Sequence, residues 1–166
     1  AFLGIGLWIV ASPADWEAAT LVLIFGSLLA LLIPLLLNAR TIRTLGRVER
    51  DRWMTIWPLT LLAGWLTVAS PLNLLTVATG NGALPAALPP LGWALADVVA
   101  VVIVALLAAW RVRLMAYSIP VAWGLLGVFV AEQERNPTLG FSALAAALVV
   151  LAGALVIVFQ LRPGVE

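Results

Sequence analysis

The sequence contains no cysteine, no histidine and no lysine, and only 10% of its residues are charged. The absence of cysteine excludes disulfide bonds, thiolate nucleophiles and cysteine metal sites. The absence of histidine removes the commonest general base and the usual axial ligand of haem. Serine and threonine hydroxyls therefore have no usual base to activate them, and no two carboxylates share an apolar stretch. We expect no catalytic residue, no metal site and no enzyme activity.

Apolar residues are what the sequence has in excess, at 64% of the chain. A soluble domain has about 45–50% apolar and about 25% charged residues. A chain with so few charges could not cover its own surface in water. The composition therefore predicts an integral membrane protein.

Five apolar stretches are long enough to cross a bilayer, which takes about 20 residues in a helix. Spanning segments must be helices or a closed barrel, since lipid offers backbone groups no hydrogen-bond partner. The runs are continuous and lack the alternation of barrel strands, which favours helices. We predict a single all-α transmembrane domain over residues 1–166, with spans at 18–37, 55–78, 91–110, 114–131 and 139–161.

The apolar segment 1–11 is too short to span, at about 15 Å for its first ten residues as a helix. We expect it to be the end of a helix whose beginning is missing from this chain. A short segment lying at the membrane interface is the alternative.

Several residues mark the ends of the predicted helices. Asp15 is placed to cap the first span, Pro90 to begin the third, and Asn136 with Pro137 to begin the last. Three further prolines fall inside spans, where neighbouring helices can satisfy the freed carbonyls: Pro34, Pro71 and Pro120.

All nine basic residues are arginines, and their distribution is asymmetric. If every span crosses, eight lie on one side, namely Arg40, Arg43, Arg47, Arg50, Arg52, Arg111, Arg113 and Arg162. Arg135 alone lies on the other. Positive residues mark the cytoplasmic side, so we expect the 40–52 loop in the cytoplasm of a bacterium and the protein in its inner membrane. We expect this loop to contact anionic lipid head groups, and we expect no nucleic-acid partner.

Eight tryptophans are present, and the spans place them at different depths. Trp16, Trp53, Trp57, Trp93 and Trp110 fall near helix ends, as in interfacial aromatic belts. Trp65 and Trp123 fall near the middle of their spans, where an indole N–H needs a partner. They either pack against small residues, helped by Gly64, Gly124 and Gly127, or form the wall of a site for a flat apolar ligand.

Asp97 is the one ionisable residue well inside a span, about 10 Å below the helix start. A charge at this depth costs a few kcal/mol, so the side chain should face protein or a wet cavity. Asn73 has a similar depth on the preceding span. We therefore expect a hydrogen bond between Asn73 and Asp97.

Two segments resemble the tryptophan-rich sensory protein family of the TspO/MBR type. In WPLTLLAGWLTVASPLNLL, residues 57–75, the matching positions are Pro58, Gly64, Trp65, Ala69 and Asn73. In AYSIPVAWGLLGVFVAEQ, residues 116–133, they are Ala122 to Leu125 and Gly127. The resemblance implies a five-helix protein that binds porphyrins, sterols and related flat apolar molecules, and it suggests the C-terminal part of a larger relative.

The sequence departs from the compact family members in lacking their Trp-rich loop with a Pro-Pro segment. Porphyrin binding is therefore not carried over, and only Trp65, Asn73 and Trp123 are taken as candidate lining residues, with Asp97 added for its depth. The expected ligand is a tetrapyrrole, a carotenoid or a sterol-like lipid, with no covalently bound cofactor. Two alternatives stay open: an accessory subunit of a larger membrane complex, or a small transporter that uses Asp97.

The arginine asymmetry generates a first prediction. Single cysteines placed by Gly46→Cys and Glu134→Cys, in a chain without native cysteine, should react with a membrane-impermeant maleimide from opposite sides of the membrane. Labelling of both positions from one side would contradict the five-span topology.

Overall fold

The computed structural model describes residues 1–14, 16–45 and 49–160. These ranges contain no strand, and they contain α1 (Phe2–Ala11), α2 (Glu17–Leu37), α3 (Ala39–Thr44), α4 (Trp57–Gly80), α5 (Pro90–Val112), α6 (Met115–Glu132) and α7 (Pro137–Leu155). A π-helical turn at Arg52–Ile56 leads into α4, and another at Val156–Gln160 follows α7. The predicted all-α class is confirmed.

Five helices are long and apolar enough to cross a membrane: α2, α4 with its π-helical turn, α5, α6 and α7 with its π-helical turn. They coincide with the five predicted spans, and α6 is the shortest at 18 residues. The predicted end of the last span, at residue 161, lies outside the described residues. The polytopic helix bundle with five full spans and one short apolar helix is confirmed.

Proline and asparagine start the helices where the sequence predicts. Helix α5 begins at Pro90, and Asn136 caps α7 by accepting a hydrogen bond from the Leu139 backbone N–H at 3.5 Å. The predicted cap Asp15 lies outside the described residues. Pro34, Pro71 and Pro120 are inside α2, α4 and α6 as expected.

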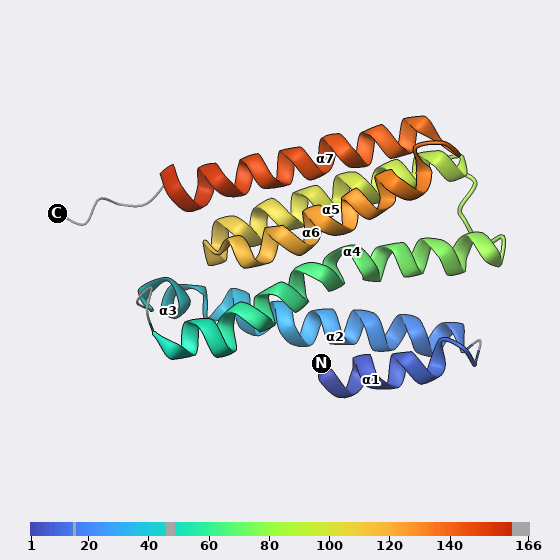
Figure 1. Ribbon diagram of the computed structural model, residues 1–166. Coiled ribbons are helices and arrows are strands. Elements are labelled where there is room, and N and C mark those ends of the chain that lie inside the picture. Colours follow the sequence, from blue (N-terminus) through green and yellow to red (C-terminus); the bar gives the residue numbers. More distant parts are fainter. Residues whose placement is uncertain (15, 46–48, 161–166) are drawn as a thin grey trace.

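The short helix α1 packs lengthwise against α2 (Figure 1). The Ser27 hydroxyl, halfway along α2, donates to the Ala1 carbonyl oxygen at 3.2 Å. A methyl group added at Gly4 would collide with Ser27, so the two helices approach closely. Helix α1 therefore runs along α2 and is held against it by this close contact.

Helix α4 is the centre of the arrangement (Figure 1). It packs against α2 on one side, with α1 beyond, and against α5 and α6 on the other. Helix α7 packs on α5 and α6 and completes that side. Each spanning helix therefore contacts at least one other over much of its length, and α4 joins the two halves.

Glycines permit the close crossing of α4 and α6. A Cβ at Gly64 would collide with the Tyr117 carbonyl oxygen and lie 2.8 Å from Pro120 Cγ. A Cβ at Gly124 would lie 3.0 Å from Val68 Cγ1. Such small residues let transmembrane helices approach and gain van der Waals contact. A Cβ added at Gly127, in contrast, would meet no other atom within 4 Å, so this glycine is not needed for the crossing.

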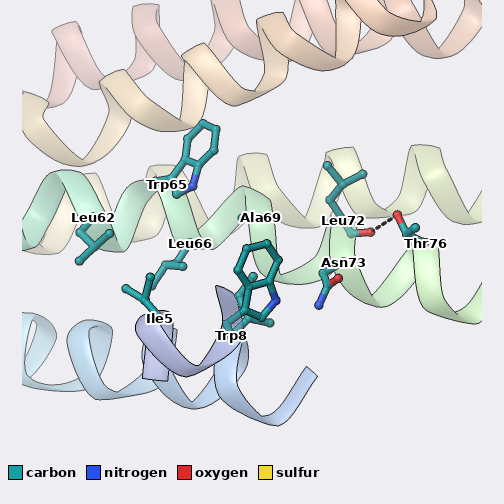
Figure 2. A pocket seen from close by; sticks show the side chains of 10 residues that line it. Ile5, Trp8, Leu62, Trp65, Leu66, Ala69, Leu72, Asn73 and Thr76 are labelled. Carbon is teal, nitrogen blue, oxygen red and sulfur yellow. Dashed lines mark hydrogen bonds between the residues drawn. The ribbon is translucent and has the colours of Figure 1, made fainter. Parts of the chain in front are cut away.

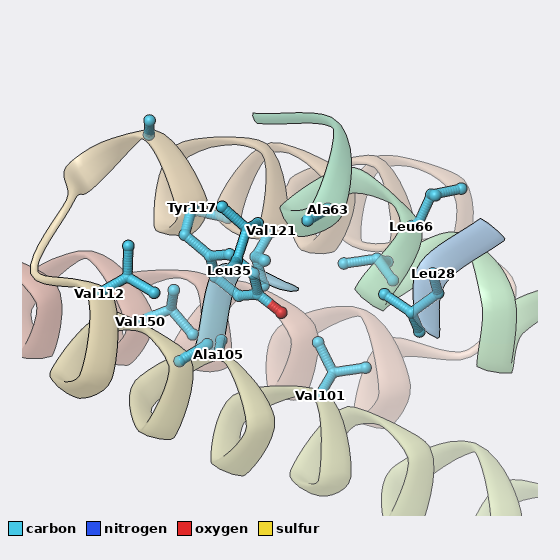
Figure 3. Packing of buried hydrophobic residues seen from close by; sticks show 14 of the residues in the cluster. Leu28, Leu35, Ala63, Leu66, Val101, Ala105, Val112, Tyr117, Val121 and Val150 are labelled. Atoms are coloured by element: carbon cyan, nitrogen blue, oxygen red, sulfur yellow. The ribbon is translucent and has the colours of Figure 1, made fainter. Parts of the chain in front are cut away.

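The only tyrosine of the chain links the same two helices. Tyr117 is fully buried, and its hydroxyl lies 2.6 Å from Thr67 Oγ1. Since Thr67 donates its one hydroxyl hydrogen to the Ala63 carbonyl, the tyrosine is the donor. Figure 3 shows Tyr117 among apolar side chains from α2, α4, α5, α6 and α7.

Arginines from separate parts of the sequence gather at one end of the bundle. Helix α3 packs against α5, whose last turn contains Arg111 and whose C-cap is Arg113. Partial desolvation lowers the pKa of Arg43, and the positive charges of Arg113, Arg111 and Arg40 act in the same direction. Arg135 belongs to the opposite end, 3.9 Å from Glu132. Arg47 and Arg162 lie outside the described residues.

The belt tryptophans lie at the helix ends. Trp53 and Trp57 stack with ring centroids 4.7 Å apart where α4 begins. Trp93 is in the first turn of α5 and Trp110 in its last, and Trp16 directly precedes α2. These positions are the ones that an interfacial belt requires.

The α4–α6 crossing generates a second prediction. Gly64→Ala should lower the free energy of unfolding by about 1–3 kcal/mol, because the methyl group meets a carbonyl oxygen that cannot rotate away. Gly127→Ala is the matched control and should be neutral or stabilising, by up to about 1 kcal/mol. Unfolding titrations in dodecyl maltoside micelles would measure both, and equal stability of the two variants would contradict the close crossing.

Candidate functional site

The two long faces of α4 border different spaces. One space is bordered by α1 and α2 and, on the α4 side, is lined by residues at helical spacing: Leu62, Trp65, Leu66, Ala69, Leu72, Asn73 and Thr76. Residues near the α4 end on the other side point toward α5: Pro71, Leu74, Leu75 and Ala78. Successive residues are about 100° apart around a helix, so the angular position of a residue on α4 decides which of the two spaces its side chain lines.

The first space, here called the Trp65 cavity, has a volume of about 490 Å³. It is formed where α1 and α2 meet the first face of α4 (Figure 2). Its walls are apolar except for the indole nitrogens, Asn73 and Thr76. Its lining consists of Ile5, Trp8, Ile24, Leu62, Trp65, Leu66, Ala69, Leu72, Asn73 and Thr76.

Two indole rings line this cavity from different helices. Trp65 comes from α4 and is 46% exposed, and Trp8 comes from α1 and is half-buried. The Trp8 Nε1 atom is buried and has no hydrogen-bond partner among the described residues. Figure 2 shows this nitrogen on the side of the ring that faces Asn73. Because a buried N–H without a partner costs free energy, an acceptor that reached this nitrogen would lower that cost.

Asn73 adds a second polar group near Trp8. Its Nδ2 donates to Thr20 Oγ1 at 3.4 Å, and Thr20 in turn donates to the Glu17 carbonyl at 2.7 Å. The Thr76 hydroxyl donates to the Leu72 carbonyl at 2.9 Å. The cavity therefore has an amide held in position by α2, while most of the surrounding surface is apolar.

The predicted hydrogen bond between Asn73 and Asp97 is wrong. Asn73 lines the Trp65 cavity and bonds to α2, whereas Asp97 contacts the space between α4 and α5. Within the described residues Asp97 forms no hydrogen bond with Asn73. The two side chains share a depth, but Asn73 lies about 200° around α4 from Leu75, which faces Asp97. Depth predicted from sequence carries no information on this angle.

Trp123 does not line the same cavity as Trp65. It lies at the middle of α6, is 70% exposed and lines none of the cavities described here. Packing against these small residues does not explain it either, since Gly124 faces Val68 and a Cβ added at Gly127 would meet no atom within 4 Å. Of the four candidate residues, the structure brings Trp65 and Asn73 together and separates Trp123 and Asp97 from them.

Trp8 is the lining residue that the sequence did not single out. It lies in the segment that is too short to span, and the depth argument applied only to tryptophans in full spans. The glycine at position 4 was the available signal, because a small residue one turn before a tryptophan indicates close helix packing. Thr76, three residues after Asn73 on the same face, could be found in the same way.

A comparison with family models finds a match over residues 1–157, to the family described as TSPO-like protein. It includes both segments on which the resemblance was based, and it extends through α1 to α7. Neither a search of curated proteins nor a search of solved structures finds a match.

The separation of Asn73 from Asp97 generates a third prediction. In a double-mutant cycle, Thr20→Val and Asn73→Leu should couple by about 0.6 kcal/mol, the average for an interhelical hydrogen bond in a membrane. The effects of Asn73→Leu and Asp97→Leu on the free energy of unfolding should instead add within about 0.3 kcal/mol, because the two side chains share no hydrogen-bond partner. Unfolding free energies in micelles supply both cycles, and coupling in the second with none in the first would reverse the assignment.

Proposed function

Because the chain belongs to the TSPO-like protein family and has five helices able to span a membrane, we propose that this integral membrane protein binds a flat hydrophobic ligand in the Trp65 cavity. It does so without catalysing a reaction. The observation that carries the proposal is the buried, unpartnered Trp8 N–H at the edge of an apolar space that a second indole also lines.

The size and chemistry of the cavity limit the ligand. At about 490 Å³ the space falls within the range of about 300–1,000 Å³ usual for small-molecule sites. Aliphatic side chains and two indoles favour an apolar molecule with a flat face, which stacks on aromatic rings. The Trp8 N–H and the Asn73 amide favour an oxygen or nitrogen acceptor on that molecule. A sterol-like lipid or a tetrapyrrole meets these requirements, and an oxygen-bearing carotenoid meets them at one end.

A tetrapyrrole would be held through its ring faces and its polar edge. The chain has no histidine or cysteine, and neither methionine lines the cavity, so no residue of the usual kind can bind a central metal from these walls. The cavity therefore suits a metal-free ring better than haem.

A second candidate function is that of an accessory subunit in a larger membrane complex, and Trp123 is the observation that favours it. Its indole projects from the middle of α6, and it has no hydrogen-bond partner among the described residues. An indole at mid-membrane depth is better satisfied by another protein than by acyl chains. Helix α6 would then be the surface that contacts the other subunit. The arginine-rich end of the bundle would lie on the cytoplasmic side of the bacterial inner membrane.

The Trp65 cavity generates a fourth prediction. Protoporphyrin IX added to the protein in nanodiscs should quench tryptophan fluorescence saturably. Trp8→Phe should weaken binding about twofold to twelvefold, because an aromatic ring stays while one hydrogen bond worth about 0.5–1.5 kcal/mol is lost. Trp65→Leu should weaken it by a similar factor through lost stacking.

The matched control is Trp123→Phe, which lies outside the cavity and should leave the affinity unchanged. An effect of Trp123→Phe with none from Trp8→Phe or Trp65→Leu would move the site to α6. Loss of a co-purifying membrane protein in Trp123→Phe would support the subunit function instead.

A further inference from the structure

A second space of about 510 Å³ lies between α4 and α5 near the loop that joins them. Its α5 wall consists of Trp93, Ala96, Asp97 and Ala100, and the loop residues Leu84 and Pro85 close the end toward the membrane surface. It shares no lining residue with the Trp65 cavity. We call it the Asp97 cavity.

Asp97 is the only charged group in the walls of this cavity, and no hydrogen bond or ion pair joins it to any described residue. It also borders a small apolar void of about 40 Å³ among α4, α5, α6 and α7, so apolar side chains surround it on the inner side too. A carboxylate inside the hydrocarbon region costs free energy unless it is paired. The structure supplies a cavity beside the carboxylate but no cationic side chain in it.

Trp93 completes a recognition pair with Asp97. The two residues are four apart on α5, so their side chains lie one turn apart on the same face. Trp93 Nε1 donates to the Pro85 carbonyl at 3.0 Å, which holds the indole against the loop. An aromatic face beside a carboxylate attracts an organic cation, through cation–π attraction and direct charge pairing. Alanines at 96 and 100 leave room for the apolar part of such a molecule.

The surrounding charges favour the same ligand. On this end of the bundle the described acidic residues include Glu17, Glu132 and Glu134, while the one described arginine, Arg135, pairs with Glu132. The Glu17 carboxylate accepts a hydrogen bond at Oε2 from Asn81 Nδ2, at 2.5 Å. The local field therefore attracts cations to the cavity mouth.

We infer that the Asp97 cavity binds a hydrophobic organic cation, with its positive centre between the Asp97 carboxylate and the Trp93 ring and its apolar body between α4 and α5. The occupant is a free molecule and not the head group of a membrane lipid, because Asp97 lies about 10 Å inside the helix start, below head-group level. This site is independent of the ligand proposed for the Trp65 cavity.

Tetraphenylphosphonium and tetraphenylborate provide matched probes, since they have nearly the same shape and opposite charge. The full chain in nanodiscs should bind radiolabelled tetraphenylphosphonium saturably in equilibrium dialysis, and tetraphenylborate should neither bind saturably nor compete. Asp97→Asn, which keeps the side-chain shape, should weaken cation binding at least tenfold. Asp97→Glu should retain it, and Trp93→Leu should weaken it more than Trp93→Phe.

Asp51→Asn removes one negative charge at an exposed position where α4 begins, at the opposite end of the bundle, and serves as the control, with unchanged binding expected. Equal affinity of the original chain and Asp97→Asn overturns the inference, as does the absence of saturable binding by the original chain. If Asp97→Asn fails to fold, the comparison of the two probes on Asp97→Glu and the original chain decides. Loss of porphyrin binding in Trp8→Phe leaves this result unaffected, so the two proposals fail separately.

Discussion

The contact on which the rest of the structure depends is the close crossing of α4 and α6 at Gly64 and Gly124. Helices in lipid gain little from the hydrophobic effect when they associate, so their stability comes from van der Waals contact and interhelical hydrogen bonds. Glycine lets the two backbones approach, and the Tyr117 hydroxyl reaches Thr67 across the contact at 2.6 Å. With Gly64 directed at α6, the next residue, Trp65, is turned about 100° away from it and lines the cavity that α1 and α2 also border. The crossing thereby determines which side chains of α4 can face a cavity.

Polar residues on α4 then connect it to helices on both sides. Thr67 meets α6, the Ser70 hydroxyl donates to the Ile24 carbonyl on α2 at 3.5 Å, and Asn73 meets Thr20 on α2. Each of these groups is satisfied locally, which fits the rule that polar side chains inside a membrane are paired. The Trp8 indole N–H and the Asp97 carboxyl do not follow this rule. Each borders a cavity and has no hydrogen-bond partner among the described residues. The two proposals on ligands start from these two groups.

The two cavities offer different polar groups to a ligand. The Trp65 cavity is lined by residues of α1, α2 and α4 and offers hydrogen-bond donors, which suit a neutral acceptor on a flat molecule. The Asp97 cavity is lined by α4, α5 and their loop and offers a carboxylate beside an indole, which suits a cation. Helix α4 contributes one set of lining residues to each space.

Sequence alone determined the class, the number of spans and most helix ends, because the bilayer imposes a length and composition on any spanning helix and proline marks where α5 and α7 begin. Through the resemblance to the TspO/MBR type it also gave both Trp65 and Asn73 as candidate lining residues. Only the tertiary structure decided that Trp8 joins them, that Trp123 faces outward and that Asp97 lies across α4 from Asn73. The reason is geometric: the apolar pattern reports how deep a residue lies, whereas its angle around the helix matters only once neighbouring helices have packed. In a membrane almost every face is apolar, so the pattern that orients a helix in a soluble protein is missing here.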